Sequence, residues 1–368
     1  MPVSQKITPS AQDERLMAYA LRLAGKQLGL TAPNPAVGCV IALDSEIISS
    51  GVTAKGGRPH AEKIAIDKIS DKSILKNATI YVTLEPCSHV GQTAPCIDEI
   101  IKNNFKKVVI ALQDSDSRVN GAGIKKLRDA GIDVLCGVLE KEAREINRGF
   151  FMNREKNRPF VTLKLATSLD GKIATKNFDS KWITSPKARQ FAHHLRAIND
   201  AILVGANTVR YDDPSLDCRI SGLEEFSPKR IVLASKFDLA QSAKIFQNQD
   251  KIETIILSGE EIKNAPAKVI LCCVKNDRID LIDALQNLAQ SGINSLLIEG
   301  GQKTATQFLK ENFVDELVWI KNKKIIGNDG IAAIGDLHCT AVDEALANFS
   351  RVNVKELEED LITIYRKI

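Results

Sequence analysis

Apolar and polar positions alternate along the first part of the chain with two periods, which predict helices and strands in turn. The first segment, 10–29, opens with the capping pair Ser10 and Asp13 and carries apolar residues at helical spacing, so we expect a helix. A hairpin-like pair of strands is then predicted at 36–43 and 46–52. Helices are expected next at 60–70, 96–105 and 123–132, with strands at 78–85, 106–113 and 133–140.

The second part of the chain repeats this alternation after a polar helical stretch, 140–159. We place a boundary near residue 150 and expect two domains, 1–150 and 151–368. Strands that alternate with helices form a largely parallel α/β sheet, and ligands collect where its strands end. The expected strands are 160–168, 201–205, 230–235, 253–258, 268–274 and 293–301, and the expected helices are 185–200, 280–292 and 304–313.

Composition and charge narrow the class of protein. A length of 368 residues favours two domains, and 44% hydrophobic with 26% charged residues is typical of globular proteins. The net charge is only +4 and aromatic residues make up 5%, so the composition does not have the signature of a nucleic-acid binder. No apolar run approaches the roughly 18 residues of a membrane span, and the first residues do not resemble a signal peptide. We therefore expect a cytoplasmic protein that acts on a small molecule, with no nucleic-acid or membrane partner.

The eight cysteines show no repeated spacing, which argues against a disulfide framework. Most of them stand in apolar runs, where a free thiol behaves as a small hydrophobic residue. We expect six of the eight to belong to the core: Cys39, Cys136, Cys218, Cys272, Cys273 and Cys339.

The two remaining cysteines belong to a metal-binding pattern. His60, Cys87 and Cys96 are a typical ligand set of catalytic zinc, in which three protein ligands leave a fourth position for water. Glu62 follows His60 closely enough to act as general base and then general acid in a deamination. In the usual nucleotide-deaminase pattern two residues separate the cysteines, whereas here 88–95 must form a longer loop that returns to the metal.

Two other interpretations of this pattern stay open on the residues alone. A histidine at a helix start is often a capping or packing residue. A closed structural zinc site would need a fourth protein ligand, which His89 could provide. A scaffold protein, however, has no need of a carboxylate such as Glu62 beside an open metal position.

Four stretches of the first domain together resemble a known family: APNPAVGCVI, HAE, YVTLEPCSHVGQTAPC and GAGIKKLRDAGIDV. They are similar to the N-terminal, cytidine-deaminase-like α/β/α domain of the bifunctional riboflavin-biosynthesis deaminase-reductases, and the resemblance extends over essentially the whole chain. It implies that His60, Cys87 and Cys96 bind zinc and that Glu62 shuttles the proton. It further implies that Asn34 and His89 hold the pyrimidine.

The chain departs from the family pattern at three places. Gln92 stands where a basic residue is common, and Ala94 stands where a proline is common. The segment 113–123 has serines where the family often has prolines. An amide at position 92 can donate a hydrogen bond but cannot neutralise an anion, whereas the metal ligands are unaffected.

The second domain contains a paired-glycine turn, Gly300 and Gly301, between a predicted strand and a helix, where backbone amides can approach a phosphate. An ordinary tight turn is the alternative. With TLKLATSLDGKIA, SKWITSPKAR and ILVGANTVRYDDPSLDCR, this turn resembles the family's reductase domain, which has a dihydrofolate-reductase-like α/β fold and uses NADPH. The resemblance implies NADPH contacts at Ala166, Trp182, Thr208, Asp212, Ser235, Gly301, Gln302, Lys303, Thr304, Ala305, Thr306 and Gln307. It implies substrate contacts at Lys164, Ser180, Arg196, Leu216, Arg219 and Glu299.

Elementary chemistry suggests roles for some of these polar residues. Arg196 and Arg219 can bind the substrate phosphate with forked hydrogen bonds, and Lys164 and Asp170 can orient the sugar. An arginine on a helix is also often a solvated surface residue, and an aspartate before a glycine is also an ordinary turn residue. His193 and His194 are expected to be surface or packing residues.

The resemblance implies a two-step enzyme of riboflavin biosynthesis that uses Zn²⁺ and NADPH. Its first domain would deaminate 2,5-diamino-6-(5-phosphoribosylamino)pyrimidin-4(3H)-one. Its second would reduce the ribosyl group to give 5-amino-6-(5-phosphoribitylamino)uracil. A nucleoside or nucleic-acid deaminase with a C-terminal appendage and a non-catalytic zinc-binding scaffold are the alternatives. The sequence leaves open whether the chain forms a homo-oligomer and whether the intermediate is channelled between the sites.

Overall fold

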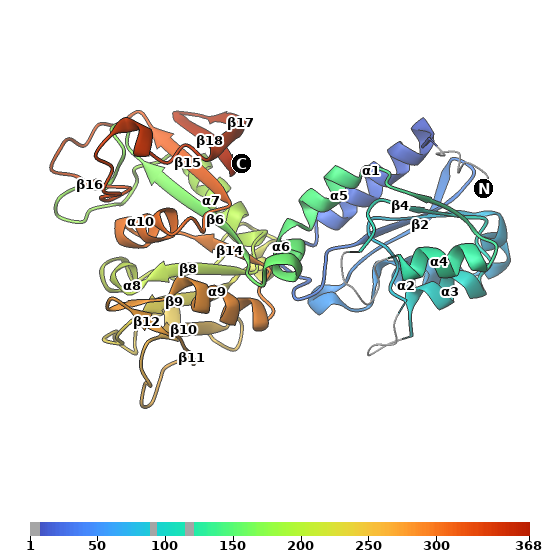
Figure 1. Ribbon diagram of the computed structural model, residues 1–368, viewed down its shortest axis with the longest axis horizontal. Coiled ribbons are helices and arrows are strands. Elements are labelled where there is room, and N and C mark those ends of the chain that lie inside the picture. Colours follow the sequence, from blue (N-terminus) through green and yellow to red (C-terminus); the bar gives the residue numbers. More distant parts are fainter. Residues whose placement is uncertain (1–7, 89–93, 115–120) are drawn as a thin grey trace. The chain divides into compact units, whose positions relative to one another are not determined.

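The computed structural model describes residues 8–88, 94–114 and 121–368, and the chain divides into two compact units, 1–156 and 157–368 (Figure 1). The expected boundary at residue 150 falls within helix α6 (Arg148–Lys156). His89 and Gln92 lie outside the described residues, as does most of the serine-containing segment.

Unit 1, residues 1–156, contains a mixed five-stranded sheet with the strand order β2-β1-β3-β4-β5. The hairpin strand β1 is antiparallel to both of its neighbours, whereas β3, β4 and β5 are parallel. The expected hairpin and the expected parallel part therefore share one sheet. The strands are β1 (Gly38–Leu43), β2 (Glu46–Val52), β3 (Thr79–Val82), β4 (Lys107–Ile110) and β5 (Asp133–Cys136).

Helices cover both faces of this sheet, with α1 and α5 on one face and α2, α3 and α4 on the other (Figure 1). Ser10 and Asp13 form the expected capping box at the start of α1. Gly38 lets α1 lie close to the sheet, because a Cβ there would lie 2.0 Å from the Ala20 carbonyl oxygen. The helices are α1 (Ala11–Gly25), α2 (Ala61–Asp67), α3 (Cys96–Lys102), α4 (Ala122–Asp129), α5 (Glu140–Ile146) and α6, with short 3₁₀ turns at Lys55–Gly57 and Lys72–Asn77.

Unit 2, residues 157–368, contains a nine-stranded sheet with the order β11-β10-β9-β8-β14-β6-β15-β18-β17. All neighbours from β11 to β15 are parallel, and β18 is antiparallel to both β15 and β17. The strands are β6 (Phe160–Thr167), β8 (Ala201–Gly205), β9 (Lys229–Ala234), β10 (Thr254–Ser258), β11 (Lys268–Leu271), β14 (Ser295–Ile298), β15 (Glu316–Asn322), β17 (Phe349–Leu357) and β18 (Asp360–Lys367). Two small ladders pair β7 (Lys172–Ala174) with β16 (Ile331–Ala332) and β12 (Val274–Lys275) with β13 (Arg278–Ile279).

Side chains alternate between the two faces of this sheet, as strand geometry requires. In β8, Leu203 belongs to the core formed with α9 and α10, whereas Ile202 and Val204 belong to the core formed with α7 and α8. The helices are α7 (Pro186–Ala197), α8 (Ala206–Asp212), α9 (Leu281–Gln290) and α10 (Gln302–Lys310), with 3₁₀ turns at Glu224–Phe226, Lys244–Phe246 and Val342–Glu344.

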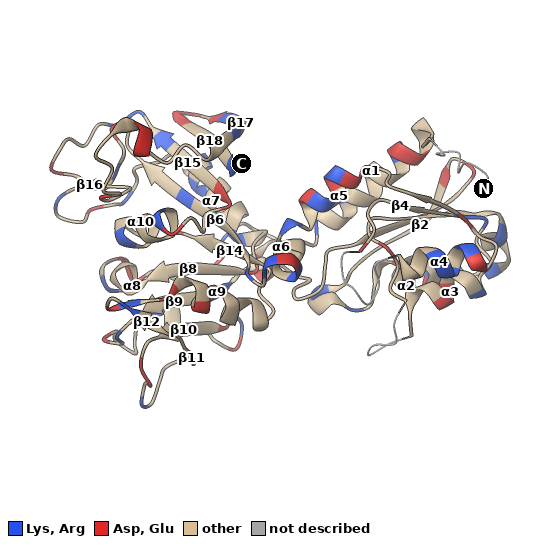
Figure 2. Cartoon of the chain, viewed as in Figure 1, with Lys and Arg blue, Asp and Glu red and all other residues tan. Residues whose placement is uncertain are grey.

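Acidic and basic side chains are mixed over both units (Figure 2). Within the described ranges, no helix has the length and apolar character that crossing a membrane requires.

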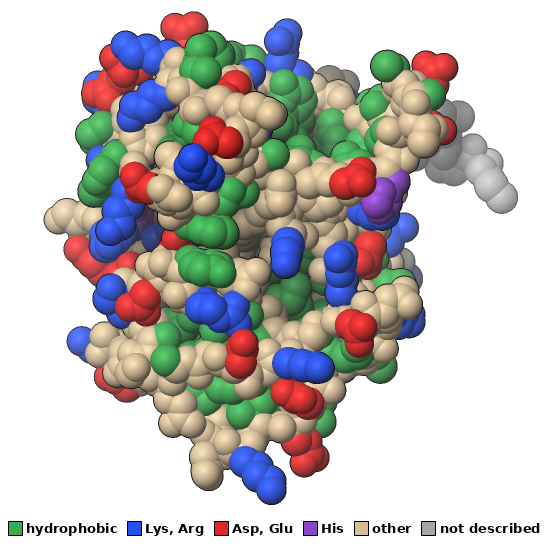
Figure 3. Space-filling model, turned by 90° about the vertical axis from the view of Figure 1, so that its left-hand side faces the viewer, with side chains coloured by type: hydrophobic (Ala, Val, Ile, Leu, Met, Phe, Trp, Pro, Cys, Tyr) green, Lys and Arg blue, Asp and Glu red, His purple; other side chains and the backbone are tan. Residues whose placement is uncertain are grey.

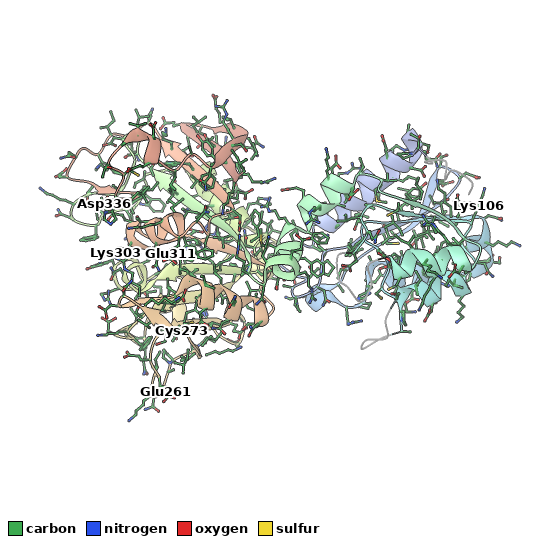
Figure 4. The ribbon with its side chains drawn as sticks, in the orientation of Figure 1. Lys106, Glu261, Cys273, Lys303, Glu311 and Asp336 are labelled. Atoms are coloured by element: carbon green, nitrogen blue, oxygen red, sulfur yellow. The ribbon has the colours of Figure 1, made fainter. Side chains whose placement is uncertain are left out.

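The expectation of six core cysteines is wrong for Cys339 and Cys273, which are exposed. Cys273 stands where the chain leaves the partly exposed edge strand β11 (Figure 4).

Candidate functional site

Three predicted metal ligands meet in unit 1. His60 immediately precedes α2, Cys87 lies in the turn after β3, and Cys96 is the first residue of α3. The His60 Nδ1 atom lies 3.2 Å from the Cys96 Sγ atom and 3.6 Å from the Cys87 Sγ atom. All three ligand atoms lie within 4.8 Å of one another. The sheet thus brings together residues from three separate segments of the chain.

These atoms fit a zinc ion. Tetrahedral zinc with Zn–N near 2.0 Å and Zn–S near 2.3 Å sets its ligand atoms roughly 3.5 Å apart. One imidazole and two thiols are a donor set that zinc prefers. Within the part of the chain that the structure describes, the metal-binding group has these three members. The described residues therefore supply the three protein ligands that a catalytic zinc centre uses.

Hydrogen bonds join the two ends of the long cysteine loop. The Cys96 backbone N–H donates to the Cys87 Sγ atom at 3.3 Å, and the Ile97 N–H donates to the Cys87 carbonyl at 3.3 Å. A hydrogen bond from the Cys96 thiol outweighs burial and lowers the pKa of Cys87 to about 4. Cys87 is thus poised as a thiolate, the form that binds metal.

Glu62 lies in the first turn of α2 and is buried, with 4% of its surface exposed. Burial raises the pKa of Glu62 to about 7, against the lowering effect of its own backbone and of His60. A carboxyl group with this pKa can accept a proton and return it near neutral pH.

Asn34, the expected pyrimidine contact, lies against the turn that leads to His60. Its Nδ2 group donates to the Gly56 carbonyl at 3.4 Å. Gly57 adopts a φ of +87°, and a Cβ there would lie 2.0 Å from Asn34 Nδ2. Glycine is therefore required where this turn passes Asn34.

Asn147 supports the loop that carries Asn34, although Asn147 lies near the C-terminal end of unit 1 in the sequence. No role for Asn147 was expected from the sequence. Its buried side chain accepts from the Ala36 N–H and donates to the Ala36 carbonyl, both at 2.9 Å. The contact joins positions 111 residues apart, so no local sequence signal reveals it.

Unit 2 contains a cavity of about 830 Å³ at the ends of strands β6, β8, β9 and β14. Figure 3 shows the side of the molecule on which α8 and α10 lie in Figure 1. Acidic and basic side chains are mixed on this side. All six expected reductase substrate contacts line the cavity: Lys164, Ser180, Arg196, Leu216, Arg219 and Glu299. Ten of the expected NADPH contacts also line it: Ala166, Trp182, Thr208, Asp212, Ser235, Gly301, Gln302, Lys303, Thr304 and Gln307.

Two expected NADPH contacts on α10 do not line this cavity. Ala305 is buried in the core. The Thr306 hydroxyl donates to the Gln302 carbonyl and accepts from the Gly335 N–H. The helical turn directs these two residues away from the cavity, whereas Lys303 lies at the start of the helix, beside the cavity (Figure 4).

The start of α10 fits a phosphate group. Gly301 is the N-cap of α10 and has no side chain that could accept from the helix. The first N–H groups of α10 can therefore donate to an anion in the cavity. A Cβ at Gly300 would lie 2.7 Å from the Thr304 Cβ atom, and a Cβ at Gly205 would lie 2.6 Å from the Thr304 hydroxyl. These glycines keep the turn tight, and a dinucleotide pyrophosphate fits beside it.

A buried ion network forms one wall of the cavity. Arg196 donates to both Glu299 oxygens, at 2.8 and 3.1 Å, and Lys164 donates to Glu299 at 3.1 Å. Burial acts to raise the pKa of Glu299, but Arg196 and Lys164 hold it well below its usual range. The third Arg196 contact is the Asp217 carbonyl at 3.0 Å. Glu299 thus occupies the Nε and Nη2 groups of Arg196, and the predicted contact between Arg196 and the substrate phosphate stays a prediction.

Other predicted polar residues have different surroundings. Arg219 is largely exposed and contacts His193, which also lines the cavity.

The sugar-orienting role of Asp170 is not supported, because Asp170 does not line the cavity. Its carboxylate accepts from Ser168 and from the Ile326 and Gly327 N–H groups. The hydrogen bond from Ser168 is the main cause that lowers the pKa of Asp170 to about 2.

Two ring contacts beside the cavity were not expected from the sequence. Phe178 and Tyr211 stack with ring centroids 4.6 Å apart, and the Arg189 guanidinium lies 4.1 Å from the centre of the Trp182 ring. All four residues line the cavity. Their sequence spacing carries no signal of these contacts.

Two family models match the chain and define its class. Residues 10–112 match the zinc-binding region of cytidine and deoxycytidylate deaminases, and residues 159–363 match the RibD C-terminal domain. The chain therefore combines a zinc-binding deaminase domain with a reductase domain. It belongs to the RibD family of riboflavin-biosynthesis proteins.

Individual relatives support this assignment over nearly the whole chain. The riboflavin biosynthesis protein RibD of Aquifex aeolicus is 41% identical and covers 96% of this chain and 98% of its own length. The Escherichia coli protein is 37% identical, over 94% and 96%. A Thermotoga maritima structure, described as a diaminohydroxyphosphoribosylaminopyrimidine deaminase and 5-amino-6-(5-phosphoribosylamino)uracil reductase, has a TM-score of 0.87 at 35% identity and covers 97% of this chain and 99% of its own.

The family, fold class and cofactors expected from the sequence are confirmed. The chain is a bifunctional riboflavin-biosynthesis enzyme with a cytidine-deaminase-like hydrolase domain and a reductase domain. Its cofactors are zinc in the first domain and NADPH in the second. A deaminase with an unrelated appendage is excluded, because the second family model spans 159–363.

Proposed function

We propose that unit 1 deaminates 2,5-diamino-6-(5-phosphoribosylamino)pyrimidin-4(3H)-one and that unit 2 reduces the ribosyl group of the product. The final product would be 5-amino-6-(5-phosphoribitylamino)uracil. The observation that carries this proposal is the buried Glu62 beside the three ligands His60, Cys87 and Cys96. The activities described for the Thermotoga maritima relative support the choice of substrate.

In unit 1, His60, Cys87 and Cys96 would hold zinc, which when bound lowers the pKa of a water molecule and so makes hydroxide available near neutral pH. Glu62 would take the proton of the attacking water and deliver it to the amine nitrogen. A carbon–oxygen bond forms, the carbon–nitrogen bond breaks, and ammonia leaves. Asn34 would hydrogen-bond the pyrimidine through its side-chain amide.

In unit 2, the first N–H groups of α10 would bind the NADPH pyrophosphate, with Trp182 and Ser235 at other points of the cavity wall. NADPH supplies the hydride that reduces C1 of the ribosyl group. The exposed Arg219 would bind the substrate phosphate, whereas Arg196 would orient Glu299. Lys164, held by Glu299, would contact the sugar.

Exchanging Glu62 for glutamine tests the assignment of the deaminase. The amide cannot shuttle a proton, so we expect ammonia release to fall roughly 100-fold to 10,000-fold while zinc stays bound. NADPH oxidation should continue when the deaminated intermediate is supplied. Metal analysis and an ammonia assay on the same preparation measure both, and a variant that still releases ammonia at the original rate would remove Glu62 from the mechanism.

We also infer that the chain works in the cytoplasm on a small phosphorylated pyrimidine, without a nucleic-acid partner. The free state of all eight cysteines supports a reducing compartment. The mixed surface charge in Figure 2 supports the absence of a nucleic-acid footprint.

A further inference from the structure

Glu85 is a buried carboxylate in the turn after β3, two positions before the ligand Cys87, and the proposed chemistry does not use it. Only 4% of its surface is exposed. Its Oε1 atom accepts from the Gly123 and Ile124 N–H groups at 2.9 and 3.2 Å. Its Oε2 atom accepts from the Gly121 and Asp114 N–H groups at 2.9 and 3.2 Å. One side chain thus binds four backbone donors.

These donors belong to the start of α4 and to the segment that precedes it. Gly121, the residue that caps α4, has no side chain that could accept from the first turn. Glu85 therefore supplies the cap from the turn that follows β3, and its negative charge lies at the positive end of the helix. This carboxylate therefore joins the turn after β3 to the start of α4.

Close packing reinforces the contact on both sides of Cys87. A Cβ at Gly123 would lie 2.8 Å from the Pro86 carbonyl oxygen and 3.0 Å from Glu85 Oε1. Only glycine lets α4 approach the turn this closely. On the other side of Cys87, Lys126 of the same helix donates to the Ser88 carbonyl at 3.2 Å. Helix α4 therefore contacts the turn before and after the metal ligand.

Cys87 is also held from a second direction, because the backbone N–H groups at the start of α3 bond to its Sγ atom and to its carbonyl. Its position thus depends on α3 and on the contact between Glu85 and α4. We propose that Glu85 is a positioning residue that sets the geometry of the zinc ligand Cys87. This inference rests on the zinc assignment made above.

Exchanging Glu85 for glutamine tests the inference in the full-length chain. An amide group offers one acceptor oxygen and turns an NH₂ donor toward backbone donors, so part of the contact is lost. Loss of a group that supports a metal ligand typically costs about 10-fold to 100-fold in metal affinity. We expect zinc to dissociate at least about 10-fold faster to a chromogenic chelator. We also expect the thiolate-to-metal absorption of the cobalt-loaded chain to change.

The matched control is Asp13→Asn. Asp13 is an equally buried carboxylate of the same unit that caps α1 and pairs with Lys107 at 3.0 Å. This variant should lower stability without changing the cobalt spectrum or the zinc dissociation rate. Gly123→Ala, which pushes α4 away from Pro86, should reproduce the Glu85→Gln effect and serves in its place if that variant does not fold.

The outcomes separate the two proposals. Faster zinc release and a changed cobalt spectrum in the Glu85 or Gly123 variant, with Asp13→Asn unchanged, would support the positioning role. Unchanged release and spectrum, or faster release in both groups in proportion to lost stability, would overturn it. If the unaltered chain binds neither metal, the zinc assignment fails, and this inference fails with it.

Discussion

At the scale of single residues, two buried carboxylates perform opposite tasks because their neighbours differ. Burial dominates at Glu62 and raises its pKa to about 7, which suits proton transfer. Glu299 lines the cavity and is largely enclosed, but Arg196 and Lys164 hold its pKa well below the usual range, so it stays ionised. The first residue is suited to exchange a proton and the second to hold two cations in place.

Exchanging Glu299 for glutamine should therefore make the stability of unit 2 depend differently on pH. Because its folded pKa is lowered, Glu299 stabilises the fold above its unfolded pKa of about 4.3, and this contribution disappears as the pH falls further. At pH 7 the variant should lose roughly 3 to 5 kcal/mol. Urea unfolding followed by the fluorescence of Trp182 and Trp319, both in unit 2, measures this. The difference should be constant above about pH 5 and narrow below it; a difference independent of pH would contradict the ionised network.

Exchanging Cys96 for serine tests the loop closure that the unusual cysteine spacing requires. A hydroxyl is a much poorer zinc ligand than a thiolate, so the variant should contain far less zinc than the unchanged chain. Cys273→Ser is the matched control, because Cys273 is exposed and lies in the other unit. Metal analysis of the purified proteins provides the measurement. Equal zinc in both variants would show that Cys96 does not bind the metal.

At the scale of elements, local patterns predicted the helices and parallel strands that place both sites. The predicted helix 140–159 is divided into α5 and α6 at Asn147, whose side chain binds Ala36 far away in the sequence. The strands β15, β17 and β18 were not expected, and β17 is an exposed edge strand without a buried face to mark it. The four donors that meet Glu85 are likewise set by tertiary contacts. The metal ligands were predictable because their residue types and spacing reflect the chemistry directly.

Exchanging Gly300 for alanine tests the role of the turn before α10. The added Cβ would lie 2.7 Å from Thr304, so the first turn of α10 must move. Overpacking of this kind costs about 1 to 3 kcal/mol, and NADPH should bind about 10-fold more weakly or worse. Gly25→Ala is the control, because no atom lies within 4 Å of the added group. Fluorescence titration with NADPH measures both, and unchanged affinity in Gly300→Ala would mean that the pyrophosphate binds elsewhere.

At the scale of the whole molecule, each unit has its own core and its own site. The deaminase residues lie within 1–156, and the reductase cavity is lined by residues of 157–368. The three residues proposed to bind zinc all belong to the first unit, so the reductase chemistry should not depend on the metal. If the cavity of unit 2 accepts only the deaminated intermediate, deamination must precede reduction.

Simultaneous measurement of ammonia release and NADPH oxidation, with and without zinc, tests the central claim most directly. The zinc-free chain should produce no ammonia and oxidise no NADPH when given the diaminopyrimidine substrate, yet it should oxidise NADPH when given the deaminated intermediate. Restoring zinc should produce ammonia and consume NADPH in equal amounts. Ammonia release without zinc, or NADPH oxidation that requires zinc even with the intermediate, would contradict two separate sites that act in sequence.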